Sequence, residues 1–124
     1  MIRKIFTFTL LVLMAGVLFA QAQKTVTITG NLIDNACAES AKDLDTKAKN
    51  HPTSCAMMEN CAQSGYAVYA DHKLYKLDEK GNGTAAEILK STTTKKGLQV
   101  KVEGTLEGDT IHVTKLTEVT ENVN

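Results

Sequence analysis

The sequence has few aromatic residues and no excess of charge of either sign. Its 124 residues include no Trp, three Phe and three Tyr, and 14 basic residues balance 14 acidic ones. A chain of this length supports one small domain, so a multidomain enzyme is excluded. Binding to a phosphate backbone requires a basic surface, and the chain lacks the basic excess that would supply it. We therefore expect no nucleic-acid partner.

The sequence also lacks the short motifs that carry common enzyme chemistry. It contains no Gly-rich phosphate loop, no G-x-S-x-G turn, no H-E-x-x-H pair and no C-x-x-C or C-x-x-C-H. Catalysis has no support from motifs, so we expect a protein that is not an enzyme.

Residues 1–22 have the pattern of a secretory signal peptide. Two basic residues precede an apolar run at residues 5–20, and Ala-Gln-Ala at its end matches the small-x-small cleavage site. The run is shorter than the ~20 residues that span a bilayer, so we expect no transmembrane anchor after cleavage. The mature chain, residues 23–124, is then a single exported domain, periplasmic or secreted. All three Phe leave with the signal, so the mature core has neither Phe nor Trp.

Alternation of apolar and polar residues predicts five β-strands in the mature chain. The second and third strands form one hairpin, and the fourth and fifth form another. Leu116 is out of phase with the alternation before it, which predicts a β-bulge near Thr114. The predicted strands are residues 25–33, 66–70, 74–77 and 98–107, with a fifth that includes Ile111 and Val113.

One helix is predicted between the third and fourth strands. A turn cluster occupies residues 80–83, and capping-box spacing from Thr84 to Glu87 predicts that a short helix begins there. A helix in this position of a five-stranded chain is the layout of the OB-fold. We therefore predict a mainly β protein, α+β by content, with a small OB-like barrel. An α+β sheet covered by one helix is the alternative, because periodicity does not reveal barrel closure.

The segment between the first and second strands, residues 34–64, has too little apolar surface to order itself. Its large apolar side chains are Leu44, Met57 and Met58 alone. Weak helices are predicted at residues 40–50 and 54–63. Small exported domains with small hydrophobic cores are commonly stabilised by disulfides or bound metal ions. We therefore expect a disulfide or a metal site in this insertion.

Every cysteine of the chain lies in this insertion, together with one histidine: Cys37, His51, Cys55 and Cys61. Three thiolates and one imidazole complete a tetrahedral Cys3His metal site, for which zinc or copper is the expected ion. Three cysteines also allow one disulfide and one remaining thiol. The metal site and the disulfide require different backbone conformations of residues 54–63.

An unbroken helix over residues 54–63 would favour the disulfide. Cys55 and Cys61 would be about 9 Å apart along the helix axis, beyond the ~7 Å Cα limit for a disulfide. Cys37 would then be one partner of any bridge, and a metal site would require a break near Glu59. Exported thiols meet an oxidising compartment, so we lean toward the disulfide. Cys55, near a helix N-terminus and close to His51, is the expected remaining thiol.

Four further residues are candidates for binding. Met57 and Met58 could add soft thioether ligands for copper, although packing of one of them against the barrel is the simpler interpretation. Tyr69 and Tyr75 would face each other across the first hairpin if the chain turned about His72, and such a face could bind a ligand or simply stabilise the sheet.

The pattern D-x-x-C from Asp34, followed by H-x3-C-A-x-M-x2-C-x3-G from His51 to Gly65, resembles a group of small exported bacterial proteins. These proteins have an OB-like barrel and no established activity. The resemblance implies an exported bacterial protein whose Cys and His residues form one constellation, and it supplies no substrate. The chain departs from the pattern at the hairpin tip, where His72 stands in place of Gly.

Together these features predict an exported, non-enzymatic binding module whose Cys/His insertion is stapled by a disulfide or holds a metal ion. One alternative is a periplasmic thiol or redox protein that uses Cys55. Another is a structural, envelope-associated barrel that binds a polymer or protein through its tyrosines. The expected partner is accordingly a small ligand, a metal ion or an envelope component.

Overall fold

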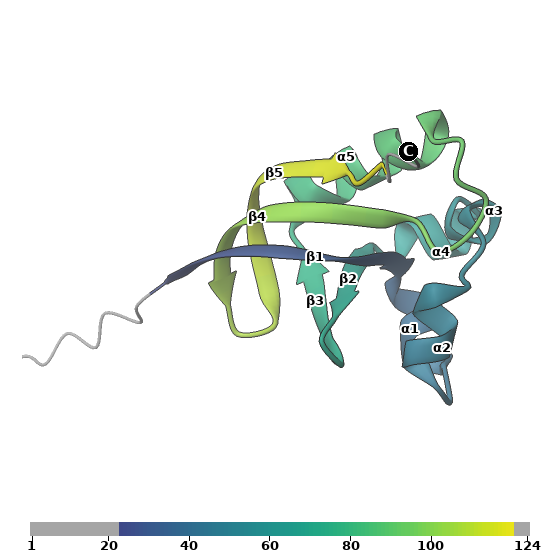
Figure 1. Cartoon of the computed structure of the whole chain (residues 1–124), viewed down its shortest axis with the longest axis horizontal. Helices are drawn as coiled ribbons and strands as arrows, with labels where there is room; N and C mark the ends of the chain where they lie inside the picture. The colour runs from purple at the N-terminus through teal and green to yellow at the C-terminus, as the bar shows by residue number, and fades with distance from the viewer. Residues whose placement is uncertain (1–22, 121–124) are drawn as a thin grey trace, which may run out of the picture.

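Within residues 23–120, five strands close into a barrel in the order β1-β2-β3-β5-β4, accompanied by five helices (Figure 1). The computed structural model describes residues 23–120, so the predicted signal peptide and its cleavage site lie outside the described residues. The elements are β1 Lys24–Asp34, α1 Asn35–Ser40, α2 Leu44–Lys49, α3 Thr53–Ala56, α4 Glu59–Gln63, β2 Tyr66–Ala70, β3 Lys73–Leu77, α5 Glu79–Ser91, β4 Gln99–Glu107 and β5 Thr110–Glu118.

The predicted OB-like barrel is confirmed. β1 pairs antiparallel with both β2 and β4, and a short parallel pairing between β3 and β5 completes the closure. α5 lies between β3 and β4 in the chain and packs against β5. The predicted bulge is also confirmed: Glu103 pairs with Lys115 and Gly104 with Val113, which leaves Thr114 without a partner.

The predicted start of α5 was wrong, because the helix begins at Glu79 and includes the expected turn cluster. Asp78 provides the N-cap: its Oδ1 accepts a hydrogen bond from Gly81 N at 2.9 Å. Its Oδ2 accepts a second bond from Val113 N at 3.2 Å, so one carboxylate ties the helix start to β5. Two glycines disfavour a helix in isolation, and this tertiary contact overrides that preference.

The insertion contains four short helices where two were predicted. α1 begins directly after β1, and α2 starts at Leu44 because Asp43, rather than Ser40, caps it. The predicted helix over residues 54–63 is interrupted at Met58, which has an extended backbone with φ −61° and ψ 142°. The carbonyl of Ala56 accepts a bond from the Tyr66 hydroxyl at 2.9 Å, which helps to fix the chain at this break.

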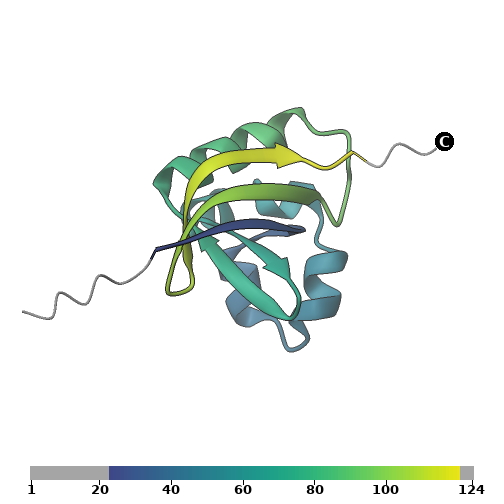
Figure 2. The same ribbon diagram turned by 60° about the vertical axis from the view of Figure 1, so that its left-hand side comes forward.

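Two apolar clusters hold the domain together. The larger fills the barrel and is covered at one side by α5. The smaller consists of Ile33, Ala38, Ala48 and Tyr69, and it fastens α1 and α2 to the outside of β1 and β2. Figures 1 and 2 both show the insertion at one end of the barrel, where β1 ends and β2 begins. Residues of the insertion are thus gathered at this end.

We predict that Gly81→Ala lowers the free energy of unfolding by about 1–3 kcal/mol, because a Cβ there would lie 2.6 Å from Val113 Cγ2. Gly83→Ala is the matched control in the same helix, since a Cβ at Gly83 meets nothing within 4 Å. Alanine's higher helix propensity should make that variant neutral or up to about 1 kcal/mol more stable. Urea unfolding of both variants provides the measurement. Equal stabilities would contradict the close contact between α5 and β5.

Candidate functional site

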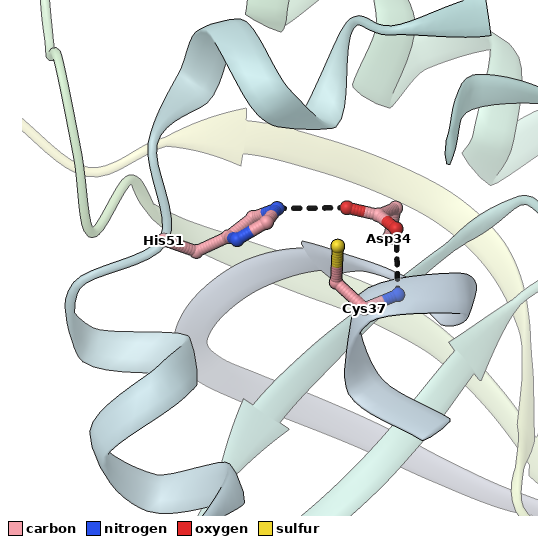
Figure 3. A group of neighbouring side chains, drawn as sticks. All are labelled: Asp34, Cys37 and His51. Carbon is pink, nitrogen blue, oxygen red and sulfur yellow. Dashed lines mark hydrogen bonds and ion pairs between the residues drawn. The ribbon is translucent and has the colours of Figure 1, made fainter. Parts of the chain in front are cut away.

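Three side chains from separate parts of the chain meet where the insertion joins the barrel. Asp34 ends β1, Cys37 lies on α1, and His51 lies between α2 and α3. One ligand-type atom from each lies within 4.8 Å of the other two. Figure 3 shows the Cys37 sulfur beside the hydrogen bond that joins His51 to Asp34. An oxygen, a sulfur and a nitrogen donor therefore share one small region.

Asp34 is the centre of this group and is fully buried, with 0% of its surface exposed. Its Oδ2 accepts a hydrogen bond from Cys37 N at 2.9 Å and so caps α1, while its Oδ1 lies 2.7 Å from His51 Nε2. Burial opposes ionisation, but the bonds from Cys37 N and His51 outweigh it and hold the pKa of Asp34 below its usual value. We infer that Asp34 is an ionised acceptor.

His51 is buried, with 3% of its surface exposed, and in the described part of the chain only one of its ring nitrogens has a hydrogen-bond partner. Because ionised Asp34 accepts from Nε2, we assign a proton to Nε2. Nδ1 has no hydrogen-bond partner within residues 23–120. Buried polar atoms are usually satisfied, so this nitrogen is an exception that requires an explanation.

The backbone around His51 is fixed by a close approach of Gly97. The carbonyl of His51 accepts a hydrogen bond from Gly97 N at 3.0 Å. Gly97 has φ +65°, and a Cβ there would lie 2.3 Å from the Lys49 carbonyl oxygen. Only glycine meets both conditions, because it tolerates the left-handed region and has no Cβ. The histidine is thus held in place from the β4 side of the barrel.

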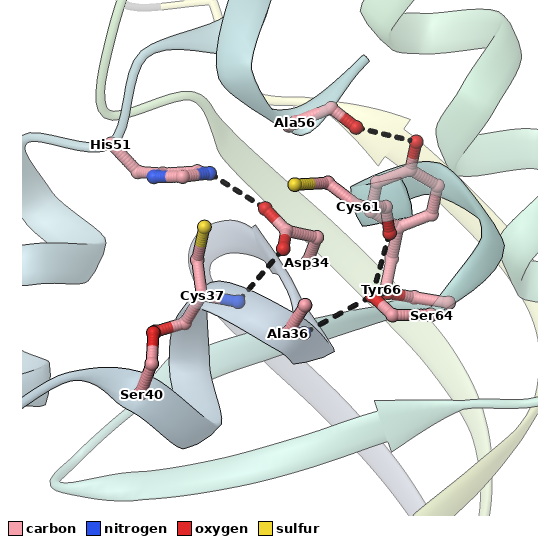
Figure 4. Close-up of polar contacts among 10 residues, drawn as sticks. Asp34, Ala36, Cys37, Ser40, His51, Ala56, Cys61, Ser64 and Tyr66 are labelled. Atoms are coloured by element: carbon pink, nitrogen blue, oxygen red, sulfur yellow. Dashed lines mark hydrogen bonds and ion pairs between the residues drawn. The ribbon is translucent and has the colours of Figure 1, made fainter. Parts of the chain in front are cut away.

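Cys61 approaches the same group from α4, as Figure 4 shows. Burial and the charge of Asp34 raise its pKa, and a polar contact with the Cys37 thiol partly offsets this rise. Burial likewise raises the pKa of Cys37, to about 12, with further contributions from Asp34 and Cys61. Both sulfurs are therefore protonated thiols at neutral pH while they remain unligated.

Hydrogen bonds fasten α1 to the end of α4. Asn35 N donates to the Gly65 carbonyl at 2.9 Å, and Asn35 Nδ2 donates to the Ser64 carbonyl at 2.9 Å. Ala36 N donates to Ser64 Oγ at 3.0 Å. Together these bonds hold the helix of Cys37 against the helix of Cys61.

Cys55 lies on α3, outside the group formed by Asp34, Cys37 and His51. It is near enough for its charge to raise the pKa of Cys61. The predicted activation of Cys55 required a regular helix N-terminus and a neighbouring His51 ring. α3 has only four residues and no side-chain cap, and the His51 ring binds Asp34. The structure therefore does not provide the expected basis for a reactive Cys55.

The disulfide that the sequence favoured is not formed. Cys37, Cys55 and Cys61 are all free thiols. The argument for it assumed an unbroken helix over residues 54–63, and the break at Met58 removes that premise. An interruption of this helix is what the predicted metal site required.

The predicted pairing of two tyrosines was wrong. The hairpin turns through two residues rather than three, so Tyr75 is opposite Val68 and Tyr69 is opposite Leu74. Adjacent positions along a strand point to opposite faces. Tyr69 accordingly packs in the smaller cluster outside the barrel, whereas Tyr75 packs against the main core. The two rings do not form a common ligand face.

Other candidate side chains lie outside the group. Met57 and Met58 are 44% and 60% exposed, so the expectation that one of them packs on the barrel was wrong. His72 has φ 60° at the hairpin turn, as its predicted position requires. His112 is half-exposed, and its Nε2 lies 2.7 Å from a carboxylate oxygen of Glu107.

Asp34 is the one site residue that the Cys/His inventory missed. Its signal was present in the sequence, because Asp is a preferred helix N-cap residue and Asp34 follows a predicted strand. It also stands three residues before Cys37. Periodicity alone did not show that α1 begins there. The cap uses one carboxylate oxygen, and the other oxygen bonds to His51.

Comparisons with protein-family models, with curated proteins and with solved structures found no match for this chain. The resemblance to small exported bacterial proteins therefore stays a prediction, and the structure supports only its Asp, Cys and His cluster. Within the described residues, no helix has the length and apolar character needed to cross a membrane.

We predict that Cys37 resists alkylation in the folded, metal-free protein. With a pKa of about 12, its thiolate fraction at pH 8 is roughly a thousandfold smaller than that of an unfolded cysteine. Iodoacetamide labelling at pH 8 with a chelator and reductant, followed by peptide mapping, gives the rate. The same cysteine in urea is the control. Equal rates in both states would show that Cys37 is not shielded in this way.

Proposed function

We propose that this chain is an exported, non-enzymatic binding module that holds a transition-metal ion in its insertion. Asp34, Cys37, His51 and Cys61 are the proposed ligands. The observation that carries the proposal is the mutual approach of donor atoms from Asp34, Cys37 and His51 to within 4.8 Å at the junction of insertion and barrel. Cys61 lies beside this group in Figure 4, although outside its 4.8 Å limit, and would supply the fourth donor that a tetrahedral site needs.

The spacing of the donor atoms fits one ion after small movements. Tetrahedral zinc ligands at about 2.0–2.3 Å from the metal lie about 3.3–3.8 Å from one another. The His51–Asp34 hydrogen bond of 2.7 Å must therefore lengthen by roughly half an ångström when both groups bind metal. The Cys37 sulfur lies within 4.8 Å of a donor atom of both Asp34 and His51 and needs only side-chain adjustment, whereas the Cys61 sulfur lies outside this group and would have to move toward it. No rearrangement of the barrel is required.

A bound cation would pair with the donor atoms of this cluster and stabilise the short helices around it. The cluster places an ionised carboxylate and two thiols around the buried ring of His51, whose Nε2 already faces the Asp34 carboxylate and would give up its proton to bind the ion. The surrounding helices have only four to six residues, and isolated helices of that length are unstable in water. Metal binding would contribute free energy directly to the folding of such a segment.

The donor set favours zinc over copper. Thiolate, imidazole and carboxylate are all usual zinc ligands, whereas Cu(I) prefers soft sulfur donors. The thioethers that would favour copper, Met57 and Met58, belong to the exposed break between α3 and α4. Export, inferred from residues 1–22, remains part of this proposal.

Cobalt(II) titration of the reduced mature protein, residues 23–124, tests the site. We expect one equivalent to give thiolate charge-transfer and tetrahedral d–d absorption, and zinc to displace it. Cys61→Ser and His51→Ala should each weaken binding at least about 100-fold, because loss of even an outer-shell partner costs 10–100-fold. Cys55→Ser is the matched control and should retain the affinity. If Cys55→Ser weakens binding as much as Cys61→Ser, the ligand set is wrong; if no ion binds, the proposal fails.

We further predict that order in the insertion depends on the three cysteines. Replacing all three by Ser should raise hydrogen exchange across residues 34–64, because their apolar contacts are few. The β4–β5 hairpin, which is paired from Val100–Glu118 to Glu107–Thr110 except at the Thr114 bulge, should stay protected and serves as the internal control. Unchanged protection of the insertion would show that packing alone holds it.

A further inference from the structure

We infer that Cys37 and Cys61 form a thiol–disulfide switch that opens and closes the metal site. The inference rests on the proposed function, because it concerns the control of that same site. It assigns different roles to the three cysteines: two alternate between metal ligation and a disulfide, and Cys55 takes part in neither.

The placement of the two helices carries this inference. α1 and α4 pack together and are fastened by the bonds from Asn35 and Ala36 to Ser64 and Gly65. In Figure 4 the Cys37 and Cys61 side chains both extend toward the Asp34 carboxylate. Each thiol affects the pKa of the other, which indicates that the two side chains are neighbours. A small change in side-chain torsion can therefore bring the sulfurs together without unfolding the insertion.

Cys55 lacks the same connection to Cys37. Its helix, α3, is held by different partners: Thr53 N donates to the Lys95 carbonyl at 2.9 Å, and Tyr66 Oη donates to the Ala56 carbonyl at 2.9 Å. These bonds tie α3 to the segment before β4 and to β2 rather than to α1. Cys37 and Cys61 are thus the pair that the backbone favours.

Disulfide formation and metal binding exclude each other because they use the same two sulfur atoms. The sulfurs of a disulfide are about 2.05 Å apart, whereas two thiolates on one zinc are about 3.8 Å apart. Oxidation would leave Asp34 and His51 as the only donors of the proposed set. We expect the zinc affinity to fall at least about 100-fold with the loss of both thiolates.

A small-molecule disulfide of the glutathione type is the proposed oxidant. Each cysteine reacts as a thiolate, which is either the zinc-bound form or, without zinc, a thiol that has given its proton to solvent. The first thiolate attacks the oxidant and breaks its S–S bond, which forms a mixed disulfide and releases one small thiolate. The second cysteine thiolate then attacks the mixed disulfide, forms the Cys37–Cys61 bond and releases the second small thiolate. The protein loses two electrons, the oxidant gains them, and bound zinc leaves as the free ion. The reverse reaction restores the site.

The test equilibrates the mature protein in glutathione redox buffers with and without zinc. Intact mass and peptide mapping identify the disulfide, and a chromogenic chelator measures zinc release. We expect a Cys37–Cys61 disulfide without zinc, and its midpoint should shift about 100-fold toward oxidised glutathione when zinc is present at 100 times its dissociation constant. Cys55→Ser is the matched control and should keep both responses, whereas Cys61→Ser should form no Cys37–Cys61 bridge.

The outcomes distinguish this inference from the function on which it rests. A disulfide that forms but leaves the zinc affinity unchanged overturns the switch and leaves the metal site standing. A disulfide that includes Cys55 also overturns it, as does a reduced pair that no redox buffer oxidises. If the reduced protein binds no zinc, the proposed function fails and the switch fails with it. Intact mass and peptide mapping would still show which thiols pair.

Discussion

The buried carboxylate of Asp34 is the interaction on which the insertion and its site depend. A buried charge costs several kcal/mol unless it is paired and hydrogen-bonded, so its partners cannot move far from it. One oxygen fixes the start of α1 and the other fixes the His51 ring. Asp34 therefore positions the end of β1, α1 and His51 together, and the barrel fixes where all three lie.

The insertion is held in place largely by hydrogen bonds, whereas the barrel is stabilised by apolar packing. The small cluster around Ile33 fastens only α1 and α2. α3 and α4 are held by the Tyr66 hydroxyl and by bonds from the first residues of α1. A segment held in this way has low intrinsic stability, which makes it suited to ordering by a ligand and to control by a change in its thiols.

The barrel was predictable because its signals are local. Period-two alternation located the first four strands within two residues and identified the fifth by Ile111 and Val113, and an out-of-phase leucine located the bulge at Thr114. Local signals failed where a distant partner decided the outcome. α5 begins early because Asp78 also bonds to β5, and the tyrosines separate because Asp71 and His72 both take positive φ in a two-residue turn.

The sequence by itself determined that a five-stranded barrel carries one apolar-poor insertion, and that every cysteine lies in it with one histidine. Spacing along the chain could not decide which of these side chains meet, because that depends on where the helices break and how they are fastened. Only the tertiary structure brought Asp34 into the group, placed Cys61 beside Cys37 and left Cys55 on a separate helix. The physical reason is that these positions are fixed by hydrogen bonds between different elements of the chain, from the Tyr66 hydroxyl to the Ala56 carbonyl and from the Asn35 side chain to the Ser64 carbonyl.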